Sequence, residues 1–309
     1  MVKTVLTVCT CRRPDGLSRL FRSLVSLRVP GTFSVVVVEN DAGRAGLDVC
    51  RSLPGDYPWS VHCVMEPQPG ICFARNRAVR EALAQQPDFI ANLDDDEWPA
   101  EHWLEELHRI QASSGADAVG GPVVPVFPEN AMEWEHLRAH YGAEPDLADG
   151  TACELYAGGN FLARSRCFEA FMPAPFDPAF NTLGGEDLYF FKRLSQRGLA
   201  MAWAARATAF EDVPASRMTH EWLLRRHRRR GQVNIMVQRK IDPSPASEAV
   251  RAAKTASVFV RASIGRFITR LTGSANPDAE FDLMYGLGRL DAHFRRLDHA
   301  NTFVHGGPS

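Results

Sequence analysis

The pattern of apolar and polar positions in the first hundred residues predicts strands that alternate with helices. Between the strands, apolar residues recur at helical spacing at 17–25 and 72–84. This order predicts a mostly parallel sheet with right-handed crossovers. Short apolar or β-branched runs indicate buried strands at 4–8, 34–38, 61–65 and 89–93.

Polar side chains follow the predicted strands at the points where these strands end. Ligands of parallel sheets bind outside the carboxyl ends of the strands, so these side chains are expected to converge on one site. They are Thr10 and Arg12 after the first strand, Glu39, Asn40 and Asp41 after the second, and Asp94 to Glu97 after the fourth.

Composition indicates an ordinary soluble globular protein and narrows the class of ligand. The 309 residues are 45% hydrophobic and 23% charged, enough for one large α/β domain with an appendage or for two modest domains. The net charge of −2 gives no overall attraction for nucleic acid. Seven cysteines, an odd number, favour free thiols in a reducing cytosol, and Cys9 and Cys11 lack the second ligand pair of a zinc site. We expect no signal peptide and no transmembrane helix.

The chain changes character after residue 215. Residues 217–240 hold eight basic residues and one acid, and residues 251–271 hold five basic residues and no acid beside an apolar helical stripe. We therefore predict a catalytic domain over 1–215 and a basic, amphipathic helical extension over 216–309. The first basic segment covers a diphosphate, meets an acidic lipid carrier, or is a solvated face. The second is an interfacial helix or an ordinary helix packed on the domain.

The strongest chemical signal is the acidic run that follows the fourth predicted strand. In an extended segment alternate side chains share a face, so Asp94 and Asp96 are expected to point together. Paired carboxylates suit Mg²⁺ or Mn²⁺, which prefer oxygen ligands and often bridge to phosphates. The alternative is a solvated acidic loop that caps a helix beginning near Pro99.

A second signal is Gly184-Gly185-Glu186-Asp187, followed by an apolar helix. The two glycines permit close approach of backbone to a ligand. A carboxylate at the N-terminus of that helix is able to accept a proton from a sugar hydroxyl. The alternative is simple helix capping, which explains one acid better than two.

Two weaker signals complete the set. Arg75, in the segment 69–76, pairs with a phosphate, stacks on a base, or is a surface arginine of a helix. Gly158-Gly159 brings backbone close to an acceptor sugar or forms a β-bulge.

Together these motifs resemble the family 2 glycosyltransferases, which have the GT-A fold, and within them the bacterial glucosyltransferases of succinoglycan-type exopolysaccharide assembly. The resemblance spans residues 3–235 with matching order and spacing. The segments that carry it are 8–14, 38–41, 66–76, 93–99, 157–160 and 176–191.

The resemblance implies an inverting, metal-dependent transfer from a nucleotide-diphosphate sugar, usually a uridine one. Asp187 would be the catalytic base and Glu186 would orient the acceptor hydroxyl. Asp94 and Asp96 would meet Mg²⁺ or Mn²⁺. The side chains implied for the nucleotide and its diphosphate-linked ribose are Thr10, Arg12, Glu39, Asn40, Arg75, Asp94 and Asp95.

Two departures from the family pattern stand out. Many relatives have a histidine metal ligand after the base, where this chain has Phe210, so either Glu211 or Asp212 substitutes or the acidic run and the phosphates suffice. Glu39 also stands where an aspartate is usual.

The leading hypothesis is a transferase that extends a glycan or lipid-linked oligosaccharide in exopolysaccharide or cell-surface polysaccharide synthesis. It would be cytoplasmic, with peripheral contact at the inner face of the cell membrane. The alternatives are a sugar-phosphate nucleotidyltransferase, although 9–16 lacks the usual glycine-rich loop, and a non-catalytic module that binds sugar nucleotides or glycans.

Overall fold

The fold was analysed in a computed structural model that describes residues 1–142, 145–272 and 278–294. The chain divides into two compact units. Unit 1 holds residues 1–181 and 186–213, and unit 2 holds 182–185 and the described residues from 214 onward. The division after 213 lies close to the predicted boundary at 215, while the division of function between the two parts stays a prediction. The tail after Phe303 lies outside the described residues.

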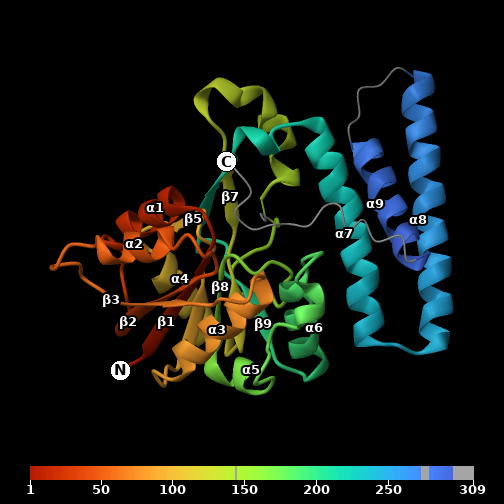
Figure 1. Ribbon diagram of the computed structural model, residues 1–309. Coiled ribbons are helices and arrows are strands. Elements are labelled where there is room, and N and C mark those ends of the chain that lie inside the picture. Colours follow the sequence, from red (N-terminus) through yellow and green to blue (C-terminus); the bar gives the residue numbers. More distant parts are fainter. Residues whose placement is uncertain (143–144, 273–277, 295–309) are drawn as a thin grey trace. The chain divides into compact units, whose positions relative to one another are not determined.

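Unit 1 is built on a seven-stranded sheet in the order β3-β2-β1-β4-β8-β6-β9 (Figure 1). Its strands are β1 (Lys3–Thr10), β2 (Thr32–Glu39), β3 (Ser60–Met65), β4 (Phe89–Asn92), β6 (Ala118–Gly120), β8 (Phe161–Arg164) and β9 (Met201–Trp203).

Most strand pairs of this sheet are parallel, and β8 alone among these seven strands runs antiparallel to its neighbours β4 and β6. The predicted mostly parallel sheet flanked by helices is confirmed. The helix α2, which is seven residues long, was not predicted. The helices of unit 1 are α1 (Pro14–Leu24), α2 (Ala45–Arg51), α3 (Ile71–Leu83), α4 (Trp103–Ser114), α5 (Ser165–Glu169) and α6 (Glu186–Gln196).

A second, three-stranded sheet has the order β5-β10-β7, formed by β5 (Glu97–Pro99), β10 (Ala209–Asp212) and β7 (Val123–Val126). It overturns the expected extended conformation of the acidic run and also the alternative of a helix cap. Asp95 and Asp96 lie in a turn, closed by a hydrogen bond from the Glu97 amide to the Asp94 carbonyl, so the run is not extended. The acids also cap no helix, because β5 follows them and α4 begins only at Trp103.

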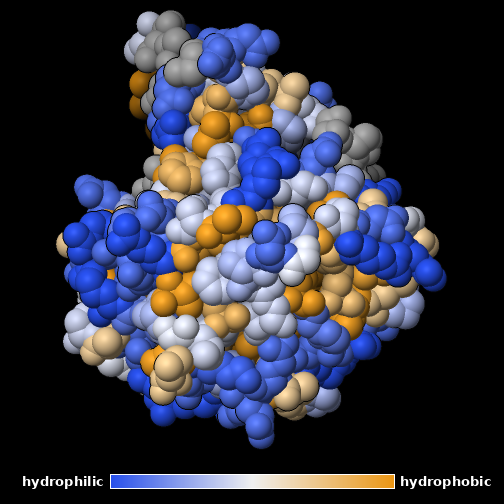
Figure 2. All heavy atoms as spheres, turned by 90° about the vertical axis from the view of Figure 1, so that its left-hand side faces the viewer, coloured by the Kyte–Doolittle hydropathy of each residue, from blue (hydrophilic) through white to orange (hydrophobic). Residues whose placement is uncertain are grey.

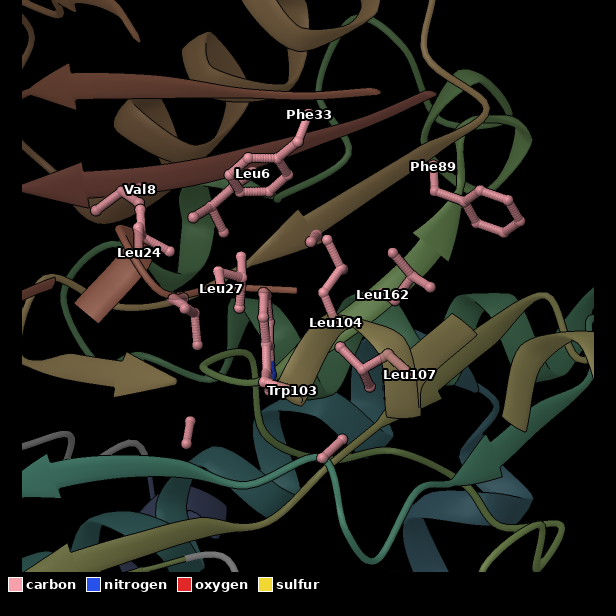
Figure 3. Packing of buried hydrophobic residues seen from close by; sticks show 14 of the residues in the cluster. Leu6, Val8, Leu24, Leu27, Phe33, Phe89, Trp103, Leu104, Leu107 and Leu162 are labelled. Atoms are coloured by element: carbon pink, nitrogen blue, oxygen red, sulfur yellow. The ribbon is translucent and has the colours of Figure 1, made fainter. Parts of the chain in front are cut away.

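The core of unit 1 lies between β1, β2 and the helices α1 and α4 (Figure 3). Valine and other apolar side chains fill β1 and β2, while α1 and α4 bury one apolar stripe each. Trp103 is fully buried, and its indole N–H donates to Asn160 at 2.7 Å. The Asn160 amide in turn donates to the carbonyls of Pro122 and Ala207. Asn160, which directly follows Gly158-Gly159, therefore links this part of the chain to the buried Trp103 and to the segments that contain Pro122 and Ala207.

Unit 2 contains α7 (His220–Ile241), α8 (Pro245–Thr272) and α9 (Asp278–His293), and α9 packs against both of the others (Figure 1). Glycines allow this close packing. A Cβ added at Gly288 or Gly231 would collide with backbone of the facing helix, at Arg228 and Tyr285 respectively. The predicted helical extension is confirmed for the described residues.

Hydrophilic side chains cover most of the face shown in Figure 2, with apolar side chains visible between them. No helix among the described residues combines the length and the hydropathy needed to cross a bilayer.

Candidate active site

Arg75 is a buried cation at the centre of the predicted site. It lies on α3, is only 4% exposed, and its Nη2 donates to Asp94 at 3.0 Å. Its Nη1 donates to the carbonyl of Gly158 at 3.2 Å, and its Nε lies 3.4 Å from a Glu186 carboxylate oxygen. The surface-arginine interpretation is therefore wrong. One guanidinium joins the acidic run, the glycine pair and the start of α6.

Asp187 and Glu186 form the first turn of α6, as predicted. Asp187 accepts hydrogen bonds from the amide of Gly158 at 2.8 Å and from the amide of Leu188. Burial raises the pKa of both carboxyl groups, and burial together with the charge of Asp187 raises the pKa of Glu186 to about 7 although Arg75 opposes the shift. Carboxyl groups with raised pKa values are suited to proton transfer near neutral pH.

Gly158 and Gly159 are required by the close approach of these side chains. A Cβ at Gly158 would lie 2.7 Å from both Arg75 Nη1 and Asp187 Cβ. A Cβ at Gly159 would lie 2.0 Å from a carboxylate oxygen of Glu97. The glycine pair therefore admits protein side chains, and its predicted contact with an acceptor sugar stays a prediction.

The acidic turn is held by the loop after β1. Asp95 is buried and accepts from the hydroxyl of Thr10 at 2.8 Å and from the amide of Cys11 at 3.4 Å. Burial and the neighbouring Asp96 raise the pKa of Asp95 to about 7, against the effect of Arg13. Arg13 lies 3.1 Å from Asp95 and 2.6 Å from Asp96. Asp94 and Asp96 are thus paired with two different arginines.

Pairing of β5 with β10 places the two acids of β10 on opposite faces. Glu211 is opposite Glu97 in the register, while Phe210 is opposite Trp98 and stacks on it. Because side chains alternate along a strand, Glu211 shares the face of Glu97, and Asp212 shares that of Phe210. Asp212 is instead ion-paired with Arg19, whose guanidinium lies over Trp98.

Glu97 was expected near the site with the rest of the acidic run but was given no role there, and it is buried beside the other site residues. Its carboxylate accepts from the Asp94 amide at 3.1 Å. Burial, followed by the charges of Asp94, Glu211 and Asp96, raises its pKa well above the ordinary range. Asp95, the second residue of the run, and Glu97 are buried, so Asp94 and Asp96 are the more exposed carboxylates, with 31% and 20% of their side chains accessible.

The side chains implied for the nucleotide are mostly engaged with the protein itself. Glu39 is fully buried and accepts from the amides of Gly46 and Asp41, at 2.6 and 3.0 Å. Asn40 donates to the carbonyls of Glu66 and Gln68 and accepts from the Gly70 amide, which fixes the loop before α3.

Arg12 has a left-handed backbone, with φ of 58°, and lies 3.6 Å from Asp41. With 47% of its side chain exposed, Arg12 is the most accessible of the predicted side chains in the loop after β1.

The acidic turn has the chemistry to bind a metal ion, but a complete set of ligands would need donors beyond its carboxylates, such as substrate phosphates. Among the described residues, no group of three or more His, Cys, Asp and Glu side chains is placed to hold a metal ion. Asp94 and Asp96 supply hard oxygen ligands with partial exposure. Mg²⁺ is commonly bound by one or two carboxylates together with substrate phosphates, and this is the donor set available here.

Comparison with known proteins supplies the family. The model of glycosyl transferase family 2 matches residues 6–171, more than half of the chain. The chain belongs to glycosyltransferase family 2. A curated relative, the succinoglycan biosynthesis protein ExoM of Rhizobium meliloti strain 1021, is 31% identical over 229 residues, which cover 74% of this chain and 72% of ExoM.

Solved structures place this glycosyltransferase in the GT-A fold. The mannosyltransferase PcManGT of Pyrobaculum calidifontis, solved with GDP-Man and Mn²⁺, matches with a TM-score of 0.65 and 17% identity, over 96% of this chain and 88% of that one. TarS 1–349 of S. aureus, solved with UDP, matches with a TM-score of 0.53 and 12% identity, over 96% and 92%. The predicted family and fold are confirmed.

Removal of the central guanidinium is expected to destabilise unit 1. Arg75→Met leaves Glu186 and Asp94 without their shared cation, at a cost of about 3–5 kcal/mol in the free energy of unfolding. Urea denaturation measures it. The matched control, Arg77→Met on the same helix, removes a more exposed ion pair with Glu81 and is expected to cost less than about 1 kcal/mol. Equal losses in the two variants would contradict the central position of Arg75.

The raised pKa of Glu186 predicts a pH dependence of stability. The pKa rises from 4.5 to about 7 on folding, so the folded protein binds the extra proton between these values. This stabilisation is complete below pH 4.5 and is lost as the pH rises through 7, by up to about 3 kcal/mol. Glu186→Gln is expected to flatten this part of the profile in urea denaturation at pH 5 to 8. The exposed control Glu133→Gln should keep the wild-type slope, and a Glu186→Gln slope as steep as wild type would refute the assignment.

Proposed function

We propose that this glycosyltransferase is an inverting, metal-dependent hexosyltransferase that uses a nucleotide-diphosphate sugar, a UDP-sugar. The acceptor would be a glycan or lipid-linked oligosaccharide in exopolysaccharide or cell-surface polysaccharide synthesis. The observation that carries the proposal is a chain of contacts from Asp94 through Arg75 and Gly158 to Asp187. It puts the first acid of the acidic turn and the proposed base around one buried cation.

Asp187 would act as the general base. As the acceptor hydroxyl oxygen bonds to the anomeric carbon, its proton passes to an Asp187 carboxylate oxygen and the bond to the diphosphate breaks. A single displacement of this kind inverts the anomeric centre and needs no protein nucleophile. The amide of Gly158 fixes one oxygen of Asp187, which orients the base for this transfer. Glu186, beside it, would orient the acceptor hydroxyl.

Mg²⁺ or Mn²⁺ would be held by Asp94 and Asp96 and would stabilise the negative charge that develops on the departing diphosphate. Glu211 is the better candidate for the place of the family's histidine, because it shares the face of Glu97, whereas Asp212 is paired with Arg19. Thr10, Glu39 and Asn40 would shape the nucleotide pocket through the loops that they hold. The half-exposed side chain of Arg12 would contact the nucleotide.

The similar proteins support this chemistry. PcManGT was solved with a nucleotide sugar and Mn²⁺, TarS 1–349 was solved with a uridine nucleotide, and ExoM is a succinoglycan biosynthesis protein. Membership of glycosyltransferase family 2 argues against a nucleotidyltransferase, and the competing function is a non-catalytic module that binds sugar nucleotides or glycans. The non-catalytic module would not need an ionised carboxylate at position 187.

The amphipathic face of α8 favours contact with an anionic membrane. Lys254, Arg261 and Arg270 on this helix are exposed, and α8 carries no acid after Glu248. Basic residues attract anionic lipid while exposed apolar side chains insert below the headgroups. The apolar side chains of α8 that are between 52% and 71% exposed are Val260, Ile264, Phe267, Ile268 and Leu271.

Asp187→Asn separates catalysis from binding. The amide cannot take the proton, so transfer is expected to fall by about 10² to 10⁴-fold. Binding is followed by thermal shift with UDP and GDP, each with and without Mn²⁺, since a ligand that binds only the folded state raises the melting temperature. The variant should keep the metal-dependent shift of the wild type, as should the control Asp48→Asn, which replaces an exposed acid of α2.

Two results would overturn parts of this proposal. Full transfer activity in Asp187→Asn would exclude Asp187 as the base. A wild-type protein indifferent to both nucleotides, with and without Mn²⁺, would exclude nucleotide-sugar transfer and favour the non-catalytic module.

Negative charge placed on the apolar face of α8 should strongly weaken membrane binding. Wild type is expected to sediment with vesicles that contain phosphatidylglycerol, to bind pure phosphatidylcholine weakly, and to release at high salt. Ile264→Glu and Phe267→Glu should lower binding at least tenfold, whereas Val126→Glu, at an exposed position of β7, should not. The membrane proposal would be refuted if the wild type did not bind the vesicles. It would also be refuted if the variants lost self-association and kept lipid binding.

A further inference from the structure

Arg13 occupies the part of the acidic turn where the proposed metal ligands lie. Its Nη1 is 2.6 Å from Asp96 Oδ2 and 3.1 Å from Asp95 Oδ1. The Arg13 side chain is 21% exposed, like that of Asp96, whereas Asp95 is buried. The two acids therefore differ in exposure. Asp95 belongs to the interior, whereas Asp96 is partly exposed to solvent beside the Arg13 guanidinium.

The position of Arg13 is fixed from two sides. Arg13 immediately precedes the first residue of α1, Pro14. A Cβ added at Gly16, in the first turn of α1, would lie 2.5 Å from the Asp95 carbonyl, so the helix packs directly on the acidic turn. Asp95 is also bonded to the hydroxyl of Thr10 and the amide of Cys11. The guanidinium is thus held against Asp96 by contacts that do not involve Asp96.

We propose that Arg13 is a resident counter-ion for Asp96, which keeps divalent cations from binding tightly until a nucleoside diphosphate arrives. The inference rests on the proposed metal dependence. A guanidinium and a metal ion would compete for the Asp96 carboxylate, and their like charges would repel if both were bound to it. With Arg13 in place, the turn offers a cation little net attraction.

A nucleoside diphosphate changes this balance in two ways. Its phosphate oxygens complete the donor set that the described protein residues lack. Its negative charge also gives the Arg13 guanidinium a second partner, and guanidinium groups pair well with phosphate oxygens. Since Asp95 still holds Arg13 nearby, the guanidinium can leave Asp96 without leaving the site. Metal and nucleotide would therefore bind cooperatively.

Binding of Mn²⁺ alone tests this inference without any measurement of transfer. Free Mn²⁺ is followed by electron paramagnetic resonance in titrations of the full chain, with and without UDP or GDP. Arg13→Gln is expected to bind Mn²⁺ at least tenfold more tightly than wild type in the absence of nucleotide. The factor by which the nucleotide strengthens Mn²⁺ binding should shrink accordingly. Arg28→Gln is the matched control, because it removes an arginine paired with an exposed carboxylate, Glu101, outside the acidic turn, and its affinity for Mn²⁺ alone should equal that of wild type.

Arg13→Lys guards against a general disturbance of the loop. It keeps one positive charge but loses the fork that reaches two carboxylates, so its affinity for Mn²⁺ alone should lie between those of wild type and Arg13→Gln. Far-ultraviolet circular dichroism confirms that each variant is folded. If Arg13→Gln binds Mn²⁺ no more tightly than wild type, or if Arg28→Gln gains as much, the inference is wrong while the proposed function stands. If wild type binds no Mn²⁺ with either nucleotide, both fail.

Discussion

A single buried guanidinium organises this glycosyltransferase site. Arg75 contacts Asp94 after β4, the carbonyl of Gly158 and the carboxylate of Glu186 at the start of α6. Charges of one sign are costly to gather in a protein interior, and the paired cation makes their convergence tolerable. While the Gly158 carbonyl accepts from Arg75, the Gly158 amide donates to Asp187. The geometry of the proposed base therefore depends on a residue more than a hundred positions earlier in the chain.

The fold could be predicted largely because its signals are local. The four predicted strands and the two helices between them follow from apolar periodicity, and the start of α6 at Glu186 follows from the glycines before it. The turn at Asp95 could not be predicted, because it depends on contacts with the loop after β1 and on the pairing of β5 with β10. Long-range pairing of this kind leaves no periodic signal.

The sequence predicted which residue types form the candidate site, but it did not predict the contacts that each side chain makes. Asp94, Asp96 and Asp187 carry the family's motif, but the motif does not say which cation each acid contacts. Arg13 and Arg12 are adjacent and identical in type, and only the fold shows that Arg13 faces Asp96. The sequence held one signal for these contacts. Several acids that follow one strand need cations nearby, and Arg12 and Arg13 follow β1, the neighbour of β4 in the sheet.

The two arginines of the site differ in exposure, and this difference divides their roles. Arg75 is buried, so its removal leaves the buried carboxylate of Glu186 without a compensating cation, and its contacts are suited to permanent support of the proposed base. Arg13 is partly exposed and bridges a buried acid to an accessible one, so one of its two contacts can be exchanged at small cost while the other is kept. In the proposed reaction the product diphosphate and its cation leave in every cycle. A counter-charge of this second kind would then keep the acids of the turn from repelling one another.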